Sequence, residues 1–298
     1  MNKDKEPNKN WVCLFTCLKV RAIHLEVVPT MSAESFLMCL RRFISRRGKP
    51  NLIVSDNGSQ IKLGCNALMK IWKDAVINDN VQSYVANEGV NWKFITEHAP
   101  WQGGFYERLV KIVKSALKKS LGKAKVDNEQ LSTLVTEIES VINSRPLLYV
   151  NDDVNSVETL TPAHFVMLNY HIGTPDIDEE YHPKETSVTK LVESWRKGQV
   201  HLNRFWTTWC TDYMQQLRES HILLMRSKKG EVIRFPATGE AVLVKEESLP
   251  RGCWKLAKVS NLIRSEIDNV PRAAKLITCK GKVMKRPLKD LYPLEIFN

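Results

Sequence analysis

The chain has 298 residues and a formal net charge of +11, and 43% of its residues are hydrophobic. That apolar content excludes an intrinsically disordered chain. The positive charge favours a polyanionic partner, although an ordinary basic protein is the alternative. The seven cysteines are odd in number and form no Cys-x-x-Cys pair, which disfavours both a disulfide framework and a cysteine-rich zinc site.

The N-terminal segment predicts neither a leader nor a membrane span. Residues 1–10, MNKDKEPNKN, form a polar tail that does not resemble a signal peptide. The longest apolar stretch, residues 11–28, is interrupted by Lys19, Arg21 and Glu26. A bilayer span needs about 20 nearly uncharged residues, so we expect no membrane partner.

Apolar periodicity predicts strands and helices in alternation over residues 11–170, which indicates an α/β core. Ser32 can cap the first helix, which we expect to end at Gly48. The predicted strands are 11–18, 22–28, 51–55 and 91–96, and the later helices are 64–87, 105–121 and 128–143. The first two strands are close enough to form a hairpin.

The rest of the chain changes character twice. Residues 149–185 are predicted to be a loop, and a helical pattern over 188–221 carries Trp195, Trp206 and Trp209, which we expect to be buried. We assign 171–225 to a loop and helical linker. From about residue 237 short strands predict a small β-barrel, so 226–298 is taken as a C-terminal domain. That domain has 16 Lys and Arg against 8 Asp and Glu, a net charge of +8.

Asp56 is the first candidate for chemistry. It follows the short apolar strand 51–55 within the sequence Ser-Asp-Asn-Gly. Active sites of open α/β sheets collect at the carboxyl ends of strands, and a carboxylate there can bind Mg²⁺. The alternative is a plain turn residue, because Asp-Asn-Gly is an ordinary turn sequence.

Glu107 is the second candidate, near the start of the helix 105–121. Spacings of four, three and four residues place Glu107, Lys111, Lys114 and Lys118 along one face of that helix. They form a solvated face with Glu–Lys pairs, or a metal ligand beside three cations that bind phosphates. Residues 100–104, Pro-Trp-Gln-Gly-Gly, favour the second interpretation because glycines permit close backbone approach. Two carboxylates could share metal ions, but a third is usually needed.

Several motifs in one order resemble the integrase region of Bel/Pao-type LTR retrotransposons. The core motifs are KVRAIHLEVV, RRFISRRGKP, SDNG, APWQGGFYERLVKIVK, NSRPL and LTPAHF. The C-terminal motifs are WRKGQVHLNRFWTTWCTDYMQQLRE, LPRGCWKLAKV and GKVMKRPLKDLYPLE. Together they cover nearly the whole chain.

The resemblance implies an RNase H-like mixed sheet flanked by helices, then a helical linker and a small SH3-like β-barrel. It implies an Asp-Asp-Glu triad that binds Mg²⁺ or Mn²⁺, in which Asp56 matches the second member and Glu107 the third. The implied reaction is 3′-end processing and strand transfer on DNA. The implied partners are element cDNA, target DNA and further copies of the chain, and the implied location is the nucleus.

The chain departs from that family at its start. The first Asp belongs on a strand before Trp11, and residues 1–10 have no strand character. The preceding His/Cys zinc module is also missing. We therefore expect a first strand to be missing and catalysis to be impaired, as in a fragment, a misjoined gene model or a decayed copy. Ser59-Gln60-Ile61 also replaces the usual Thr-Asn-Phe.

Three functions stay open on these residues. The first is an integrase-type polynucleotidyl transferase, the second a non-catalytic DNA- or RNA-binding protein, and the third an RNase H-like nuclease. A further group of basic residues, Lys282, Lys285 and Arg286, lies on a predicted hairpin near the C-terminus. It predicts a second DNA-backbone contact, with a solvated surface as the alternative.

Overall fold

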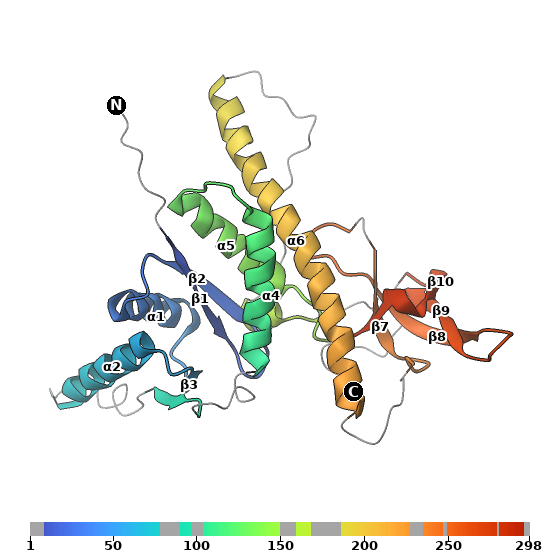
Figure 1. Ribbon diagram of the computed structural model, residues 1–298, viewed down its shortest axis with the longest axis horizontal. Coiled ribbons are helices and arrows are strands. Elements are labelled where there is room, and N and C mark those ends of the chain that lie inside the picture. The colour runs from blue at the N-terminus through green and yellow to red at the C-terminus, as the bar shows by residue number, and fades with distance from the viewer. Residues whose placement is uncertain are drawn as a thin grey trace. The chain divides into compact units, whose positions relative to one another are not determined.

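The computed structural model describes residues 9–77, 90–96, 104–149, 159–167, 186–226, 235–246, 249–278 and 280–294. It is a mixed α/β structure (Figure 1). The chain divides into two compact units. The first comprises residues 1–16, 23–114 and 123–136, and the second comprises 17–22, 115–122 and 137–298. The sequence-based boundaries at residues 10, 170 and 225 stay predictions.

The first unit opens with the predicted hairpin. Strands β1 (Trp11–Thr16) and β2 (Ile23–Val28) pair antiparallel. Helix α1 (Ala33–Arg47) follows, and the Ser32 hydroxyl caps it by accepting a hydrogen bond from the Ser35 amide at 3.1 Å. Gly48 ends the helix with a φ of +85°, a conformation that favours glycine. The predicted cap and end of this helix are confirmed.

A buried carboxylate connects α1 to β2. Glu26 is only 6% exposed. Its two oxygens accept hydrogen bonds from Arg42 at 2.8 Å and from Arg46 at 2.5 Å, both on α1. His24, also buried, lies 3.2 Å from the same carboxylate. The arginines compensate the desolvation of Glu26, because a buried charge needs paired donors to be tolerated.

The remaining strands of the first unit form a separate pair. Strand β3 (Leu52–Ser55) runs parallel to β4 (Asn91–Phe94). Among the described strands no ladder joins this pair to β1 and β2, so the expected mixed sheet is seen as two pairs. Helix α2 (Ser59–Ile77) begins five residues before the predicted residue 64, and the rest of that predicted helix, 78–87, lies outside the described residues.

Two helices and short elements complete the middle of the chain. Helices α4 (Gly104–Leu121) and α5 (Asn128–Asn143) match their predicted ranges closely. The predicted loop over 149–185 is wrong in part. The described residues there include the two-residue strands β5 (Leu148–Tyr149) and β6 (Thr159–Leu160) and the 3₁₀ helix η2 (Pro162–Phe165).

Arg145 is a fully buried arginine just after α5. Its guanidinium donates hydrogen bonds to the Ile142 carbonyl at 3.1 Å and to the Arg21 carbonyl at 2.7 Å. The first bond adds a second donor to a carbonyl in the last turn of the helix, which also accepts a hydrogen bond from the Arg145 amide at 3.3 Å. The second fixes the turn between β1 and β2. The Asn-Ser-Arg-Pro-Leu motif therefore has a structural role in this fold.

The second unit contains a long helix and an antiparallel sheet. Helix α6 (Thr186–Arg226) has 41 residues and extends beyond both predicted ends, 188 and 221. The sheet has the strand order β10-β9-β8-β7-β11. Its strands are β7 (Ala241–Val244), β8 (Leu256–Arg264), β9 (Pro271–Thr278), β10 (Val283–Pro287) and β11 (Leu291–Pro293), with the 3₁₀ helix η3 (Leu288–Asp290) before β11.

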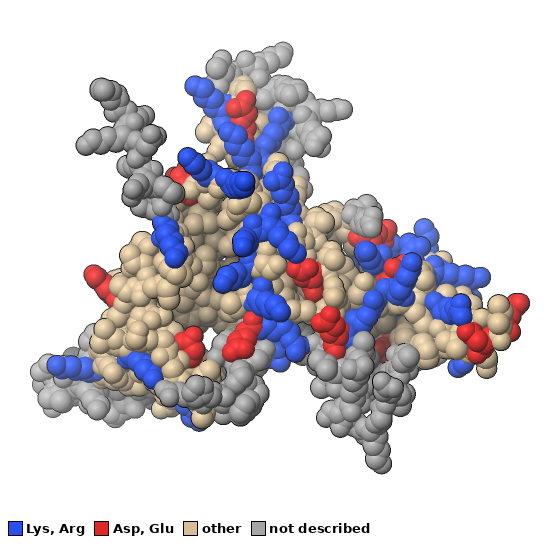
Figure 2. Space-filling view, viewed as in Figure 1, with Lys and Arg blue, Asp and Glu red and all other residues tan. Residues whose placement is uncertain are grey.

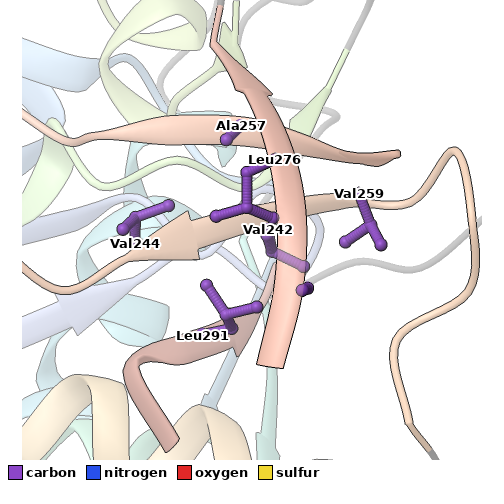
Figure 3. Close-up of a cluster of buried hydrophobic side chains, with 7 residues drawn as sticks. Val242, Val244, Ala257, Val259, Leu276 and Leu291 are labelled. Carbon is purple, nitrogen blue, oxygen red and sulfur yellow. The ribbon is translucent and has the colours of Figure 1, made fainter. Parts of the chain in front are cut away.

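This sheet has its own apolar core. Side chains from β7, β8, β9 and β11 meet on one face (Figure 3). The buried members are Val242, Val244, Ala257, Val259, Ala274, Leu276 and Leu291. The predicted short strands after residue 237 are confirmed, while β11 was missed because three residues carry too little pattern.

Aromatic rings pack α6 against the sheet within the second unit. Trp209 is fully buried and stacks on Tyr213 with ring centroids 5.0 Å apart. Trp254, just before β8, meets Trp206 and Trp209 edge-on at 5.1 and 5.8 Å. Offset and edge-to-face arrangements are the favourable ones for aromatic pairs. Trp206 and Trp209 are buried as predicted, whereas Trp195 is 42% exposed and the prediction for it was wrong.

Candidate functional site

Asp56 lies at the carboxyl end of β3, where the sequence placed it. Its side chain is exposed, and its Oδ1 accepts a hydrogen bond from the Gly58 amide at 3.0 Å. That bond closes an Asx-type turn, which leads directly into α2. The carboxylate therefore has a structural partner and free acceptor capacity, because an ionised carboxylate has about four lone-pair sites.

Hydrogen bonds hold the ends of β3 and β4 together beneath Asp56. The Asn57 side-chain amide donates to the Ile95 carbonyl at 2.7 Å. The Trp92 indole donates to the Ser55 hydroxyl at 2.9 Å, and the Ile95 amide donates to the Ser55 carbonyl at 3.0 Å. These bonds fix the position of the Asp56 backbone, as a binding site at a strand end requires.

Glu107 lies in the first turn of α4 and is exposed. A carboxylate in that position is stabilised by the positive end of the helix dipole. Its expected neighbour Lys111 has no ion pair to it among the described residues. The interpretation of this face as a row of Glu–Lys pairs is therefore not supported at Glu107.

The three lysines of α4 share one exposed face of that helix. Lys111, Lys114 and Lys118 are all exposed, while Ile112, Val113 and Ala116 on the other side are buried. We call these three lysines the α4 lysine face. Figure 2 shows Lys and Arg side chains along α4. In the described part of the chain none of the three has an ion-pair partner, although Lys119 beside them lies 3.7 Å from Asp212.

The described residues do not fit a two-metal centre. They contain no cluster of three His, Cys, Asp or Glu side chains that could hold a metal ion. Residues 97–103, which connect β4 to α4 and include most of the predicted Pro-Trp-Gln-Gly-Gly loop, lie outside the described residues. Holding two ions at a fixed spacing usually takes more carboxylates than Asp56 and Glu107 provide.

The second set of predicted basic residues does not lie on one face. Lys282 is in the turn before β10, where Gly281 has a φ of +69°. Lys285 and Arg286 are consecutive on β10, and consecutive strand residues point to opposite faces of a sheet. Lys285 is exposed, while Arg286 is half-buried. The structure therefore separates Arg286 from Lys285.

Lys275 is the basic residue that the sequence analysis missed. It lies on β9 directly opposite Lys285 in the antiparallel register, and it is exposed. Like charges directly opposite one another destabilise a sheet, so this pair favours a site for a polyanion. Both lysines lie on strands that the sequence predicts. Their pairing could not be predicted, because it depends on the register between the two strands, which the sequence does not give.

Among the residues that the structure describes, the cysteines form no metal site and no crosslink. The six in the described residues are free thiols. Burial raises the pKa of Cys210 to about 12. A side-chain hydrogen bond between Cys13 and Cys39 raises the pKa of Cys13 and lowers that of Cys39. Of these six thiols, the exposed Cys17 and Cys253 are expected to react first, because reactivity follows access and thiolate content.

None of the helices within the described residues combines the length and the apolar character needed to cross a bilayer. A family model described as "Family of unknown function (DUF5641)" matches residues 193–294, about a third of the chain. The matched segment begins inside α6 and ends after β11, so it includes the part of the helix that packs on the sheet. No curated protein matches the sequence.

One similar solved structure is a chain from the cryo-EM structure of the simian T-cell lymphotropic virus intasome in complex with PP2A regulatory subunit B56 gamma. The TM-score is 0.38 and the sequence identity 11%, over 95% of this chain and 72% of that one. At that TM-score the likeness establishes neither a fold nor a function for this chain.

Proposed function

We propose that the chain is a nucleic-acid-binding protein of integrase ancestry, in which the α4 lysine face contacts phosphates. The observation that carries the proposal is the arrangement of Lys111, Lys114 and Lys118. All three are exposed, lie on one helix face and have no ion-pair partner among the described residues. Phosphate contacts from such lysines supply affinity that does not depend on base sequence.

The C-terminal sheet is proposed as a second contact. Four strands follow one another as a meander and β11 returns to pair with β7, which supports a small SH3-like barrel. Lys275 and Lys285 form an exposed basic pair on it, and Figure 2 shows further Lys and Arg side chains over this sheet. Binding of a phosphate between the two lysines would relieve their repulsion.

Catalysis is not part of the proposal. The resemblance assigns Mg²⁺ or Mn²⁺ to Asp56 and Glu107, and both side chains are exposed and can bind a cation. The described residues hold no third carboxylate, His or Cys beside them that would complete a two-metal centre. The proposal therefore separates DNA binding, through lysines, from strand transfer, through carboxylates.

The test measures how tightly the whole chain binds a fluorescent DNA duplex. The fluorescence anisotropy of the duplex reports binding at each of a series of salt concentrations. Exchange of Lys111, Lys114 and Lys118 for Gln should weaken binding and reduce the log–log salt slope by about 0.9 for each lysine that contacts a phosphate. The matched control removes the same total charge elsewhere in the first unit. It exchanges three exposed residues for Gln: Arg41 on α1, Lys49 just after α1 and Lys70 on α2.

Equal loss in both triple variants would mean that net charge, and not the α4 lysine face, drives binding. Failure of the unmodified chain to bind at moderate salt would overturn the proposal. Asp56→Asn should leave affinity unchanged, and Glu107→Gln, which removes a negative charge from the helix face that carries the lysines, should not weaken it. Strand transfer by the unmodified chain with Mg²⁺ or Mn²⁺, lost in those two variants, would instead establish the integrase reaction, and cleavage of an RNA–DNA hybrid would establish the nuclease alternative.

A further inference from the structure

Two cysteine side chains meet inside the first unit. Cys13 lies on β1 and Cys39 on α1, and their side chains are hydrogen bonded to each other. Cys39 is 0% exposed, whereas Cys13 is partly exposed. Two adjacent thiols that are partly open to solvent are the arrangement from which a disulfide forms.

The packing around the two thiols holds β1 close to α1. Phe15 is two residues after Cys13 and therefore points to the same face of β1. Phe43 is four residues after Cys39 and lies next to it on the surface of α1. The rings of Phe15 and Phe43 stack, with centroids 4.3 Å apart and planes at 9°. The thiols and the rings are thus successive contacts along one strand–helix interface, so the packing of β1 on α1 brings the sulfurs together.

Charged side chains beside the pair influence which thiol ionises. Cys13 lies opposite Glu26 in the register of β1 and β2. Arg42, which donates a hydrogen bond to Glu26 at 2.8 Å, is three residues after Cys39 on α1. The hydrogen bond from Cys13 lowers the pKa of Cys39, and Arg42 adds to that effect against burial and the charge of Glu26. The same hydrogen bond and burial raise the pKa of Cys13. Cys39 is therefore the thiolate of the pair, the form that reacts with oxidants.

We propose that Cys13 and Cys39 are a redox modification site, at which hydrogen peroxide converts the two thiols into a disulfide that joins β1 to α1. The Cys39 thiolate attacks one peroxide oxygen and becomes a sulfenic acid, and the hydroxide that leaves takes up the proton lost from Cys39. The Cys13 sulfur then attacks the Cys39 sulfur, and the S–S bond forms as the sulfenic hydroxyl leaves with the Cys13 proton as water. Each sulfur gives up one electron, and the peroxide is reduced to water.

The other cysteines in the described part of the chain have different surroundings. Burial raises the pKa of Cys65 and raises that of Cys210 to about 12, as expected of inert core thiols. Cys17 and Cys253 are exposed and meet an oxidant first, and we expect sulfenic acids or bonds to other molecules as their products. The bond within the pair forms more slowly than these products, because Cys39 is buried.

Closing the Cys13–Cys39 bond should stabilise the first unit. The bond ties β1, one strand of a two-stranded ribbon, to α1, and a ribbon of that kind is marginal alone. It also restricts the unfolded chain over residues 13–39, which is the main way in which a disulfide stabilises a protein. We expect the midpoint of urea unfolding to rise by about 1 M.

The experiment uses the whole chain with Cys17→Ser and Cys253→Ser, which removes the two exposed thiols. This parent chain is treated with hydrogen peroxide, its remaining thiols are blocked with N-ethylmaleimide, and linked peptides are identified by mass spectrometry after digestion. We expect the link between Cys13 and Cys39 to be the main disulfide and dithiothreitol to restore both thiols. The urea midpoint should rise on oxidation and return on reduction.

Two variants of the parent chain serve as controls. Cys13→Ala removes the partner of Cys39, so peroxide should not raise its urea midpoint. Cys210→Ala, the matched control, removes a thiol on α6 and should keep the full shift.

Free Cys13 and Cys39 thiols after the treatment, or a disulfide from either to another cysteine, would overturn the proposal. So would an unchanged or lower midpoint of the oxidised parent chain, or an equal rise in Cys13→Ala. Peptide mapping of the parent chain leaves both residues of the pair in place, so the test holds even if Cys13→Ala does not fold. No readout involves nucleic acid, so the result is separate from that of the proposed function.

Discussion

The two units differ in how their strands satisfy their backbone groups. Five strands of the second unit, β7 to β11, form one continuous sheet over a shared apolar core. The four described strands of the first unit form two pairs, β1–β2 and β3–β4, that no described ladder joins. A two-stranded ribbon alone is marginal in water. The described strand pairs of the first unit therefore need packing against its helices, where Ile23, Leu25 and Leu40 are buried and the Glu26 ion pairs join α1 to β2.

The largest expected effect is in the second unit. Trp209→Ala removes a fully buried ring that contacts Tyr213 and Trp254. Phe or Trp to Ala in a core costs about 3–5 kcal/mol, and we expect a loss in that range for unfolding of this unit by urea. Trp195→Ala on the same helix, where the ring is 42% exposed, should cost less than about 1 kcal/mol. Equal losses would contradict the placement of these two rings.

A smaller effect is expected in the first unit. Changing Arg42 and Arg46 together to Ala leaves the Glu26 carboxylate buried without its two guanidinium donors. A buried charged group without partners costs several kcal/mol, but both arginines are partly exposed and water can enter in their place. We expect a loss of about 2 kcal/mol, measured by urea unfolding at pH 7.

The control for that prediction is the triple variant that also carries Glu26→Gln. Without the carboxylate there is no buried charge left to compensate, so much of the lost stability should return. If the triple variant is less stable than the double variant, the cost lies in the packing of the arginine side chains and not in the charge of Glu26.

The sequence predicted elements better than their assembly. The cap at Ser32, the end at Gly48 and the apolar periodicity of α4 depend on residues that are close together in the sequence. The ends of α1 and α4 could therefore be predicted from the sequence. The buried Glu26 was not, because its partners lie 16 and 20 residues away. Trp195 and the buried Trp209 both fit the helical pattern of α6, so the sequence predicts burial for both. Only the packing around α6 distinguishes them.

The candidate site shows the same limit. The positions of Asp56 at a strand end and of the α4 lysine face were predicted, since both follow from local spacing. The basic group near the C-terminus was only partly predicted. Alternation along β10 separates Lys285 from Arg286, and the register with β9 adds Lys275. Register is set by long-range pairing and by turn geometry, which one sequence does not reveal.

The smallest expected effect tests that register by its sign. Lys285→Gln removes one member of the like-charged pair with Lys275. The second unit should gain about 0.5 kcal/mol of stability at low salt, because a repulsive cross-strand pair is lost. The same change should weaken DNA binding, because a phosphate contact is lost. Lys289→Gln, an exposed lysine outside the strands, is the control for charge. Salt screens the repulsion between two exposed charges, so the stability gain should disappear at high salt. A gain that persists at high salt would contradict the assigned repulsion between Lys275 and Lys285.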